Sequence, residues 1–317
     1  MQIKNFISVD WGTSNFRMRL IDILSLDIIE MIESPVGVKS LYNEWEKNGG
    51  DRETYFLNFL KSQYILFKSQ IDPSIKIVIS GMASSSIGLK ELPYANLPFN
   101  IDGCSLYSEQ ITSAKISNPI FLISGVKSNS DVIRGEEVQI LGLSHLNIDS
   151  KRNIFILPGT HSKHIICDKN KVIDFKTFMT GEIFDVISEH TILKNSIVFG
   201  TLNSVNLNAF EEGIREAKNG VSILNSLFKI RANSLFEKMN NVQNYYFLSG
   251  LLIGEELKSI STDEETVLHL CAGGKLFELY KKAIQALGLD EITNIIPQKI
   301  VDSAVIRGQY KLLKTLK

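Results

Sequence analysis

The sequence predicts an α/β protein of two lobes, and three observations support this. Short apolar runs typical of strands alternate with longer runs typical of helices. Two glycine-threonine turns, at residues 10–15 and 157–163, each follow a strand-like run and lie about half a chain apart. The length of 317 residues, with 44% hydrophobic content, favours two domains over one.

In the first half, strand-like and helix-like runs alternate. The strand-like runs are residues 6–9, 16–21, 75–79 and 120–124, and the helix-like runs are residues 54–70 and 136–145. Apolar and basic side chains alternate from residue 16 to residue 21 with the period of two expected of a strand. Residues 10–15 should therefore form the bend of a hairpin.

The second half repeats this opening. A meander is predicted from the strand-like runs 153–157, 163–167 and 172–178. Helices are predicted at residues 182–190 and 208–239, and strand-glycine-helix units at residues 245–257 and 267–287. Both halves open with strand, turn, strand, which suggests a duplicated architecture. The polar stretch 147–153 is the best linker, so we predict domains at residues 1–150 and 151–317.

Composition and charge exclude several classes of function. Lys and Arg total 34 against 35 Asp and Glu, a net charge of -1, with no long basic run to track a nucleic-acid backbone. No stretch approaches the roughly 18 apolar residues that span a bilayer. Cys104, Cys167 and Cys271 are far apart and lack metal-ligand spacing. We expect a cytoplasmic protein without nucleic-acid or membrane partners. The sequence permits a homodimer and leaves the oligomeric state open.

The first turn has the composition of a phosphate-binding loop. Gly12 lets the backbone approach a ligand, and Thr13, Ser14 and Asn15 add donors suited to phosphate oxygens. Asp10 makes sense beside phosphate if a cation lies between them, because Mg²⁺ takes oxygen ligands and bridges to phosphate. The alternative is a tight hairpin that needs glycine for its own geometry.

The second turn repeats this design. Gly159, Thr160, His161 and Ser162 form the predicted loop, and two turns in matching places favour the phosphate interpretation. His161 could instead bond to backbone within the turn, and Lys163 is expected to be a solvated strand residue.

A diglycine, Gly273-Gly274, lies between a predicted strand and a predicted helix. It would let a flat ring lie against the backbone, although a plain strand-to-helix connection explains it equally well. Together with the two turns, it suggests a nucleotide whose phosphates lie between the lobes and whose base rests on the second.

Residues 128–142 place acids at the start of a predicted helix. Glutamates there often only cap the helix or complement its dipole, and one of Glu136 and Glu137 is expected to do so. Arg134 is harder to explain by capping. An arginine can hold a carboxylate bidentately and a nearby carboxylate can accept a hydroxyl proton, so this segment suits a substrate with both groups.

Small polar residues follow the strand-like run 75–79, where ligands of α/β sheets usually bind. Met82, Ser84 and Ser85 are therefore candidate substrate contacts, with a flexible loop as the alternative. Trp11 could line the same site or fill core.

These motifs resemble those of the 2-dehydro-3-deoxygalactonokinases, in the sugar kinase, heat-shock chaperone and actin superfamily. The similarity extends over essentially the whole chain, through residues 10–15, 37–38, 80–82, 134–137, 158–163, 180–182 and 248–254. It implies two ribonuclease-H-like (actin-like ATPase) lobes, each a five-stranded sheet with flanking helices, with a nucleotide cleft between them that holds ATP and an acid sugar.

The resemblance also implies roles for particular positions. Asp10 would hold Mg²⁺ through water, residues 12–15 and 159–162 would be the two phosphate loops, and residues 273–274 would lie under adenosine. Related carbohydrate kinases carry a Gly-Asp base where Gly135-Glu136 stands, so Glu136 is the expected base, with Asp131 in reserve. The superfamily usually has an acid at the position of Leu157, which leaves a metal role for the second loop open.

The implied reaction transfers the ATP γ-phosphoryl group to the terminal 6-hydroxyl of 2-dehydro-3-deoxy-D-galactonate in galactonate catabolism. Arg134 would grip the sugar carboxylate, while Mg²⁺ and the loop amides offset phosphate charge. The alternatives are a kinase for the gluconate epimer or another acid sugar, a phosphatase on the same fold, and a non-catalytic sugar sensor.

Overall fold

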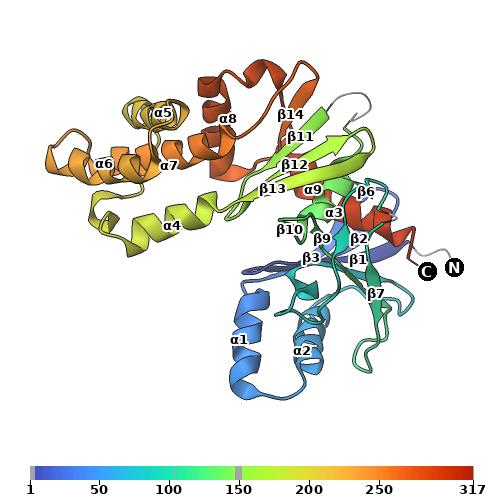
Figure 1. Cartoon of the computed structure of the whole chain (residues 1–317). Coiled ribbons are helices and arrows are strands. Elements are labelled where there is room, and N and C mark those ends of the chain that lie inside the picture. The colour runs from blue at the N-terminus through green and yellow to red at the C-terminus, as the bar shows by residue number, and fades with distance from the viewer. Residues whose placement is uncertain (1–3, 104, 147–151, 317) are drawn as a thin grey trace. The chain divides into compact units, whose positions relative to one another are not determined.

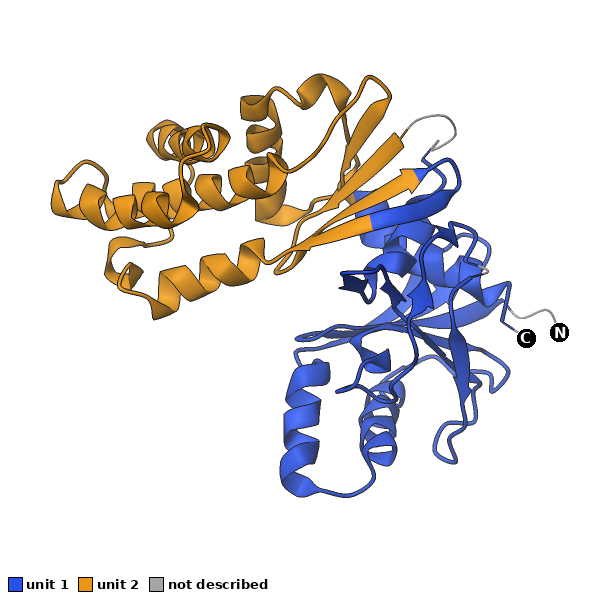
Figure 2. Ribbon diagram, viewed as in Figure 1, with its two compact units in different colours: residues 1–149, 168–174, 299–317 blue, residues 150–167, 175–298 orange. Residues whose placement is uncertain are grey.

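The computed structural model describes residues 4–103, 105–146 and 152–316. The fold is α/β, as predicted, and the chain divides into two compact units, coloured separately in Figure 2. Unit 1 comprises residues 1–149, 168–174 and 299–317. Unit 2 comprises residues 150–167 and 175–298.

Unit 1 contains a six-stranded sheet with the strand order β3-β2-β1-β4-β8-β7 (Figure 1). Its strands are β1 (Asn5–Trp11), β2 (Phe16–Asp22), β3 (Ile28–Ser34), β4 (Ile77–Gly81), β7 (Ser108–Ile111) and β8 (Ile120–Ile123). Strands β1 to β3 form an antiparallel meander, whereas β4 runs parallel to both β1 and β8. A three-stranded sheet is made of β5 (Ala95–Asn96), β9 (Val126–Lys127) and β10 (Val132–Ile133). Short strand β6 (Phe99–Asn100) pairs with the start of β13 (Lys171–Phe178).

Helices cover both faces of the large sheet in unit 1. Helices α1 (Val38–Asn48) and α2 (Arg52–Tyr64) lie on one face, and α3 (Glu136–Leu143) and α9 (Gln298–Leu313) lie on the other (Figure 1). The alternation along β1 explains both layers. Ile7, Val9 and Trp11 belong to the core cluster that contains residues of α1 and α2, so Ser8 and Asp10 face the other side.

The C-terminal helix α9 corrects the predicted division at residue 150. That division places the helix in the second domain, but all of it except its first residue belongs to unit 1. The side-chain amide of Gln309 donates to the carbonyl of Val9 and to Oγ of Ser80, both at 2.9 Å, and Tyr310 stacks on Phe6. Dividing the sequence at a single position cannot show that the C-terminal helix packs with the first half of the chain. Of the predicted linker, residues 147–151 lie outside the described residues.

Unit 2 contains strands in the order β15-β14-β11-β12-β13. These are β11 (Arg152–Leu157), β12 (Ser162–Asp168), β13, β14 (Thr266–Leu270) and β15 (Thr293–Ile295). Strand β14 runs parallel to β11 and β15. The order is that of β8-β4-β1-β2-β3 in unit 1, so the duplicated architecture predicted from the sequence is confirmed at the level of topology.

Helices make up most of the rest of unit 2. They are α4 (Thr180–His190), α5 (Ser204–Lys218), α6 (Ile223–Leu235), α7 (Asn241–Leu257) and α8 (Gly274–Leu287), with short 3₁₀ turns η2 (Lys194–Ser196) and η3 (Asp290–Ile292). One core cluster joins the sheet to α5, α7 and α8. A second cluster joins the helices α4, α5, α6 and α7 to one another.

The predicted strand at residues 245–250 is wrong, because these residues belong to helix α7. Asn240 starts the helix: its side chain accepts from the amides of Val242 and Gln243, and the Gln243 side chain accepts from the Asn240 amide. Gly250 is a point of close helix contact, since a Cβ there would lie 1.9 Å from the Phe210 carbonyl oxygen in α5. A buried helix is apolar on all sides, which hides the helical period.

No helix among the described residues has both the length and the apolar character needed to cross a membrane.

Candidate active site

The first predicted phosphate turn connects β1 and β2 in unit 1. The amide of Gly12 donates to the carbonyl of Asn15 at 2.9 Å, which closes the turn. Thr13, Ser14 and Asn15 are exposed. The first amides of α1, those of residues 38 and 39, donate to the carbonyls of Gly12 and Thr13, so the turn rests on the start of that helix.

Asp10 lies just before this turn, on the sheet face covered by α3 and α9. Burial raises the pKa of the Asp10 carboxyl, while the charges of Arg19 and Arg17 lower it and that of Glu136 raises it. Its closest ion pair is with Arg17, whose Nη1 lies 3.7 Å from Oδ2. The two arginines therefore offset only part of the desolvation of this carboxyl group.

Glu136, the predicted base, is the first residue of α3. It is partly buried, its Oε2 accepts from the Arg134 amide at 3.1 Å, and its charge acts on Asp10. Asp131 lies in the turn between β9 and β10, where its carboxylate accepts from the Val132 amide. Glu136 and not Asp131 is among the groups that shift the pKa of Asp10.

Glu137 sits under this site and does the capping that the sequence assigned to one of the two glutamates. Its side chain is fully buried, and its Oε2 accepts from the Gly135 amide at 2.7 Å. Burial, followed by the charge of Glu136, raises the pKa of Glu137 to about 8. The acid therefore keeps its proton near neutral pH. Gly135 has a φ of 112°, a left-handed conformation suited to glycine, so the turn that carries the site is fixed by its sequence.

Arg134 and the loop after β4 meet, as expected for one substrate-binding region. Nη1 of Arg134 donates to the carbonyl and to Oγ of Ser84, both at 2.6 Å, and the guanidinium lies 4.3 Å from the Tyr94 ring centroid. The Nε–Nη2 edge takes no part in the Ser84 contacts. Met82 is partly buried, and the Ser85 hydroxyl donates to the Met82 carbonyl.

Trp11 as a substrate contact is a wrong prediction. Its side chain is fully buried and packs against the rings of Phe16, Phe56 and Phe59. The period of two along β1 directs Trp11 away from the face that carries Asp10.

The second predicted phosphate turn connects β11 and β12 in unit 2. Thr160 and His161 are exposed, and Gly159 is partly exposed. The amide of Glu182 donates to the Thr160 carbonyl at 3.0 Å, so this turn also rests on the start of a helix, α4. His161 faces Glu182, with Nε2 2.6 Å from Oε2.

Two side chains next to the turn are more buried than expected. Lys163 is 6% exposed and its Nζ donates to the His161 carbonyl at 2.9 Å, which corrects its prediction as a solvated residue. Ser162 is fully buried, and its Oγ lies 2.9 Å from the Tyr280 hydroxyl. Ser162 therefore contributes neither its backbone nor its hydroxyl to the exposed surface of the turn, which is formed by Gly159, Thr160 and His161.

The fold itself gives no reason for glycine at the centre of either turn. Neither Gly12 nor Gly159 has a left-handed φ, and an added Cβ would lie 3.5 Å from the Asn15 oxygen or 3.8 Å from the His161 oxygen. A ligand that approaches the backbone closely would provide the reason. By contrast, Gly274 has a φ of 57°, which explains glycine at that position. A Cβ on Gly273 would meet only the end of the flexible Gln298 side chain, at 2.5 Å.

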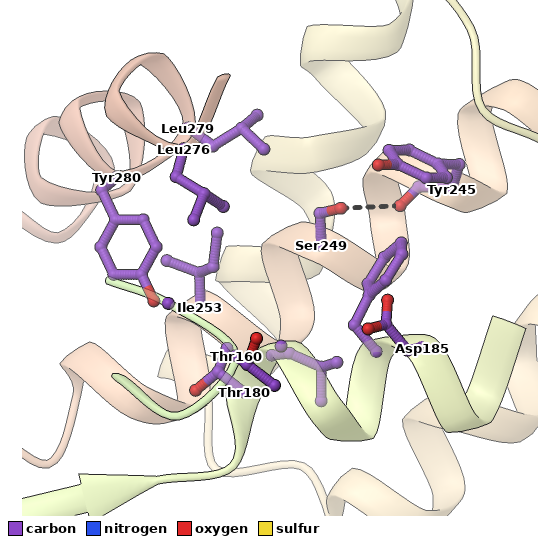
Figure 3. Close-up of a pocket in the computed structure, with 13 residues that line it drawn as sticks. Thr160, Thr180, Asp185, Tyr245, Ser249, Ile253, Leu276, Leu279 and Tyr280 are labelled. Atoms are coloured by element: carbon purple, nitrogen blue, oxygen red, sulfur yellow. Dashed lines mark hydrogen bonds between the residues drawn. The ribbon is translucent and has the colours of Figure 1, made fainter. Parts of the chain in front are cut away.

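A cavity of about 280 Å³ adjoins the second turn within unit 2 (Figure 3). It is lined by Gly159, Thr160, Thr180, Gly181, Phe184, Asp185, Tyr245, Ser249, Leu252, Ile253, Leu276, Leu279 and Tyr280. In Figure 3, Thr160 and Thr180 lie at one end, and Tyr280, Leu276 and Leu279 line one side. The lining is apolar with a few polar groups, as in small-molecule pockets. Gly273 and Gly274 do not line it.

A buried hydrogen-bond network lies behind the turn, and the sequence analysis missed it. Glu256 of α7 is 2% exposed and accepts from Tyr280, His164 and Thr180. The available signal was a glutamate in an almost wholly apolar segment, because a buried acid needs partners.

A Mg²⁺ ion that shares its ligands with waters and phosphates suits the Asp10 and Glu136 carboxyl groups better than a metal site built from protein ligands alone. Across residues 4–103, 105–146 and 152–316, no group of three or more His, Cys, Asp or Glu side chains is placed to bind a metal. Mg²⁺ is usually bound by one or two carboxylates together with waters and substrate phosphates. The partly desolvated Asp10 fits that pattern.

Comparisons with known proteins identify the family of the chain. A model of the 2-keto-3-deoxy-galactonokinase family matches residues 10–311. The chain is 31% identical over 294 residues to 2-dehydro-3-deoxygalactonokinase of Escherichia coli (strain K12), covering 90% of this chain and 91% of that protein. A crystal structure from Sinorhizobium meliloti, provisionally assigned as a 2-dehydro-3-deoxygalactonokinase, has a TM-score of 0.80 at 27% identity, covering 98% of this chain and 96% of that one.

The names 2-keto and 2-dehydro denote the same carbonyl group. The family match contains both turns, the loop after β4 and the Arg134–Glu137 segment. The chain therefore belongs to the 2-keto-3-deoxy-galactonokinase family.

Proposed function

We propose that this protein transfers the γ-phosphoryl group of ATP to the 6-hydroxyl of 2-dehydro-3-deoxy-D-galactonate in the cytoplasm. Family membership supports the reaction class and the acid sugar. The structural observation that carries the proposal is that the start of α3, where Glu136 lies, meets the end of β4 beside Asp10. A Cβ on Gly135 would lie 3.5 Å from the Gly81 Cα, and β4 pairs with β1 at Asp10 and Trp11. This arrangement joins a candidate base to a candidate metal-binding acid on one face of the sheet.

We assign nucleotide binding to unit 2 and sugar binding, with the first phosphate turn, to unit 1. The exposed backbone of residues 159–161 would receive phosphate oxygens through its amides. The adjoining cavity would take the base, because its apolar walls suit a flat ring. Residues 12–15 would provide the other group of phosphate donors. Gly273 and Gly274, at the start of α8, stay candidates for contact with the nucleoside.

Asp10 would hold Mg²⁺, which would offset the negative charge of the phosphates. Catalysis of phosphoryl transfer depends mainly on positioning and on such charge neutralisation, since the transition state is loose and in line. Arg19 and Arg17 keep part of the Asp10 charge compensated before any ligand binds.

The sugar would be held through its carboxylate and activated at its hydroxyl. Arg134 presents the Nε–Nη2 edge of its guanidinium, which suits a bidentate carboxylate contact. Glu136 would orient the 6-hydroxyl and accept its proton late in the transfer. The bonds from Nη1 to Ser84 would hold the guanidinium in place. The distance from Arg134, which would bind the sugar carboxylate, to Glu136, which would bind the 6-hydroxyl, would then select substrates by length.

The test is ADP release by the purified protein with Mg-ATP and, in separate wells, 2-dehydro-3-deoxygalactonate, its gluconate epimer, and no sugar. The proposal expects a strong preference for the first sugar. Equal use of both epimers would retain the kinase but overturn the substrate assignment. Release without sugar would indicate a hydrolase, and binding of sugar without any release would indicate a sensor.

A further inference from the structure

The buried carboxyl group of Glu256 connects four elements of unit 2 to the second turn. Its Oε2 accepts from the hydroxyls of Tyr280 in α8, at 2.7 Å, and Thr180 in α4. Its Oε1 accepts from Nε2 of His164 in β12, at 3.0 Å. The Tyr280 hydroxyl also lies 2.9 Å from Oγ of Ser162, the last residue of the turn. Figure 3 shows Tyr280 directed toward the end of the cavity where Thr160 and Thr180 lie.

The bond from Tyr280 to Glu256 sets the direction of the bond between Tyr280 and Ser162. Since the Tyr280 proton goes to Glu256, the Tyr280 oxygen must accept from the Ser162 hydroxyl. The Ser162 oxygen in turn faces the Gly159 amide at 3.4 Å. Burial and the Glu256 charge raise the pKa of Tyr280 well above its ordinary value, so this hydroxyl remains a donor. The Ser162 hydroxyl therefore donates its proton to the buried Tyr280 oxygen and cannot also donate it to a ligand.

We propose that Glu256 and Tyr280 are positioning residues that hold the second phosphate turn in its binding geometry through the Ser162 hydroxyl. The inference rests on the proposed function, because it takes this turn to bind the nucleotide phosphates. Ser162 then supports the turn from behind, and the phosphate contacts come from the backbone amides and from Thr160. A network in which each member has a partner gives such a turn one defined conformation.

Tyr280→Phe tests this arrangement, because it removes the hydroxyl and keeps the ring in the core. Hydrogen exchange of the peptide covering residues 157–163, in the ligand-free protein, should become about tenfold faster, the ratio expected for one hydrogen bond of ordinary net strength. The KM for ATP should rise about tenfold by the same reasoning, with the KM for the sugar unchanged. Ser162→Ala should give the same two changes, and the double variant should add little, because both residues belong to one network.

Tyr246→Phe is the matched control. Tyr246 is a 4% exposed tyrosine of α7 whose hydroxyl donates to the Gly200 carbonyl at 2.9 Å, with no bond to the turn. This variant loses one buried hydroxyl of the same kind, and we expect it to change neither exchange in residues 157–163 nor the KM for ATP.

The two readouts separate the inference from the function on which it rests. If Tyr280→Phe and Ser162→Ala leave exchange in residues 157–163 no faster than Tyr246→Phe does, the positioning role is overturned. The other informative result is faster exchange in Tyr280→Phe and Ser162→Ala with no change in the KM for ATP, or with no nucleotide binding even by the wild type. The network would then order the turn, but the turn would not bind nucleotide. That second result would overturn the proposed phosphate site and not the positioning role.

Discussion

Burial raises the pKa of Asp10 at the end of β1, and the charge of Glu136, at the first position of α3, raises it further. The two residues are far apart in sequence, and the alternation along β1 and the return of the chain to α3 bring them to one face of the sheet of unit 1. Asp10 is paired with Ser80 in the register of the parallel strands β1 and β4. Both residues therefore lie near the carboxyl ends of these strands, where ligands of α/β sheets usually bind.

Replacing Glu136 by Gln should lower kcat by about 10²–10⁴-fold, the usual contribution of a general base, and leave the KM for ATP unchanged. Glu137→Gln is the matched control: it alters the neighbouring acid, which is fully buried and bonded to the Gly135 amide. We expect it to retain most activity. Initial rates with both substrates varied would check this, and similar losses in both variants would refute the assignment of the base.

Glu137 should make the stability of the protein decrease as pH rises. Burial raises its pKa from 4.5 in the unfolded chain to about 8 in the fold, so the folded state binds a proton that the unfolded state has lost. The contribution is complete below pH 4.5 and is lost progressively until about pH 8, by up to roughly 5 kcal/mol at about 1.4 kcal/mol per pH unit. Glu137→Gln should flatten this dependence in denaturant unfolding measured from pH 5 to pH 8. An unchanged slope would contradict the buried, protonated acid.

Arg134→Lys should raise the KM for the acid sugar by roughly 10–100-fold and leave the KM for ATP unchanged. Lysine keeps the charge but loses the planar fork that binds Ser84 and a carboxylate together. The comparison requires saturating ATP with the sugar varied. A larger effect on ATP than on the sugar would move Arg134 to the nucleotide side of the reaction.

Gly159→Ala and Gly181→Ala should separate ligand approach from folding. A Cβ on Gly159 has ordinary space, whereas one on Gly181 would lie 2.8 Å from the Gly159 oxygen and the Thr160 Cα. Gly159→Ala should therefore keep Tm within about 2 °C and raise the KM for ATP about tenfold, and Gly181→Ala should lower Tm by more. If Gly159→Ala binds ATP normally, the backbone of this turn does not contact the phosphates.

The sequence was sufficient for the strands that flank both turns and for the repeated strand-turn-strand opening, because these depend on local alternation and on glycine between apolar runs. Edge strands such as β3, β7 and β15 were not predicted. The sequence also named Arg134 and residues of the loop after β4 separately as candidate substrate contacts, and the structure brings the two segments into contact. The error over Trp11 was avoidable, since neighbouring residues on a strand face opposite sides and Asp10 already required the other one.

Other features depend on packing that the sequence does not display. Gly250 and the apolar residues around it looked like a strand and its turn, but they serve the close contact of α7 with α5. The return of α9 to the first sheet depends on Gln309, whose bonds to Val9 and Ser80 have no local signature. The burial of Ser162 likewise involves Tyr280 of α8, a residue more than a hundred positions away in the sequence.

The central claim is phosphoryl transfer to the 6-hydroxyl of this sugar, and the most direct measurement is the ³¹P spectrum of the reaction with Mg-ATP and 2-dehydro-3-deoxygalactonate. We predict one new phosphomonoester resonance, split into a triplet by the two protons on C6, that grows in step with ADP. Inorganic phosphate alone would contradict the claim and indicate a hydrolase. A phosphoester doublet would place the phosphoryl group on a secondary hydroxyl and contradict the proposed orientation of the sugar between Arg134 and Glu136.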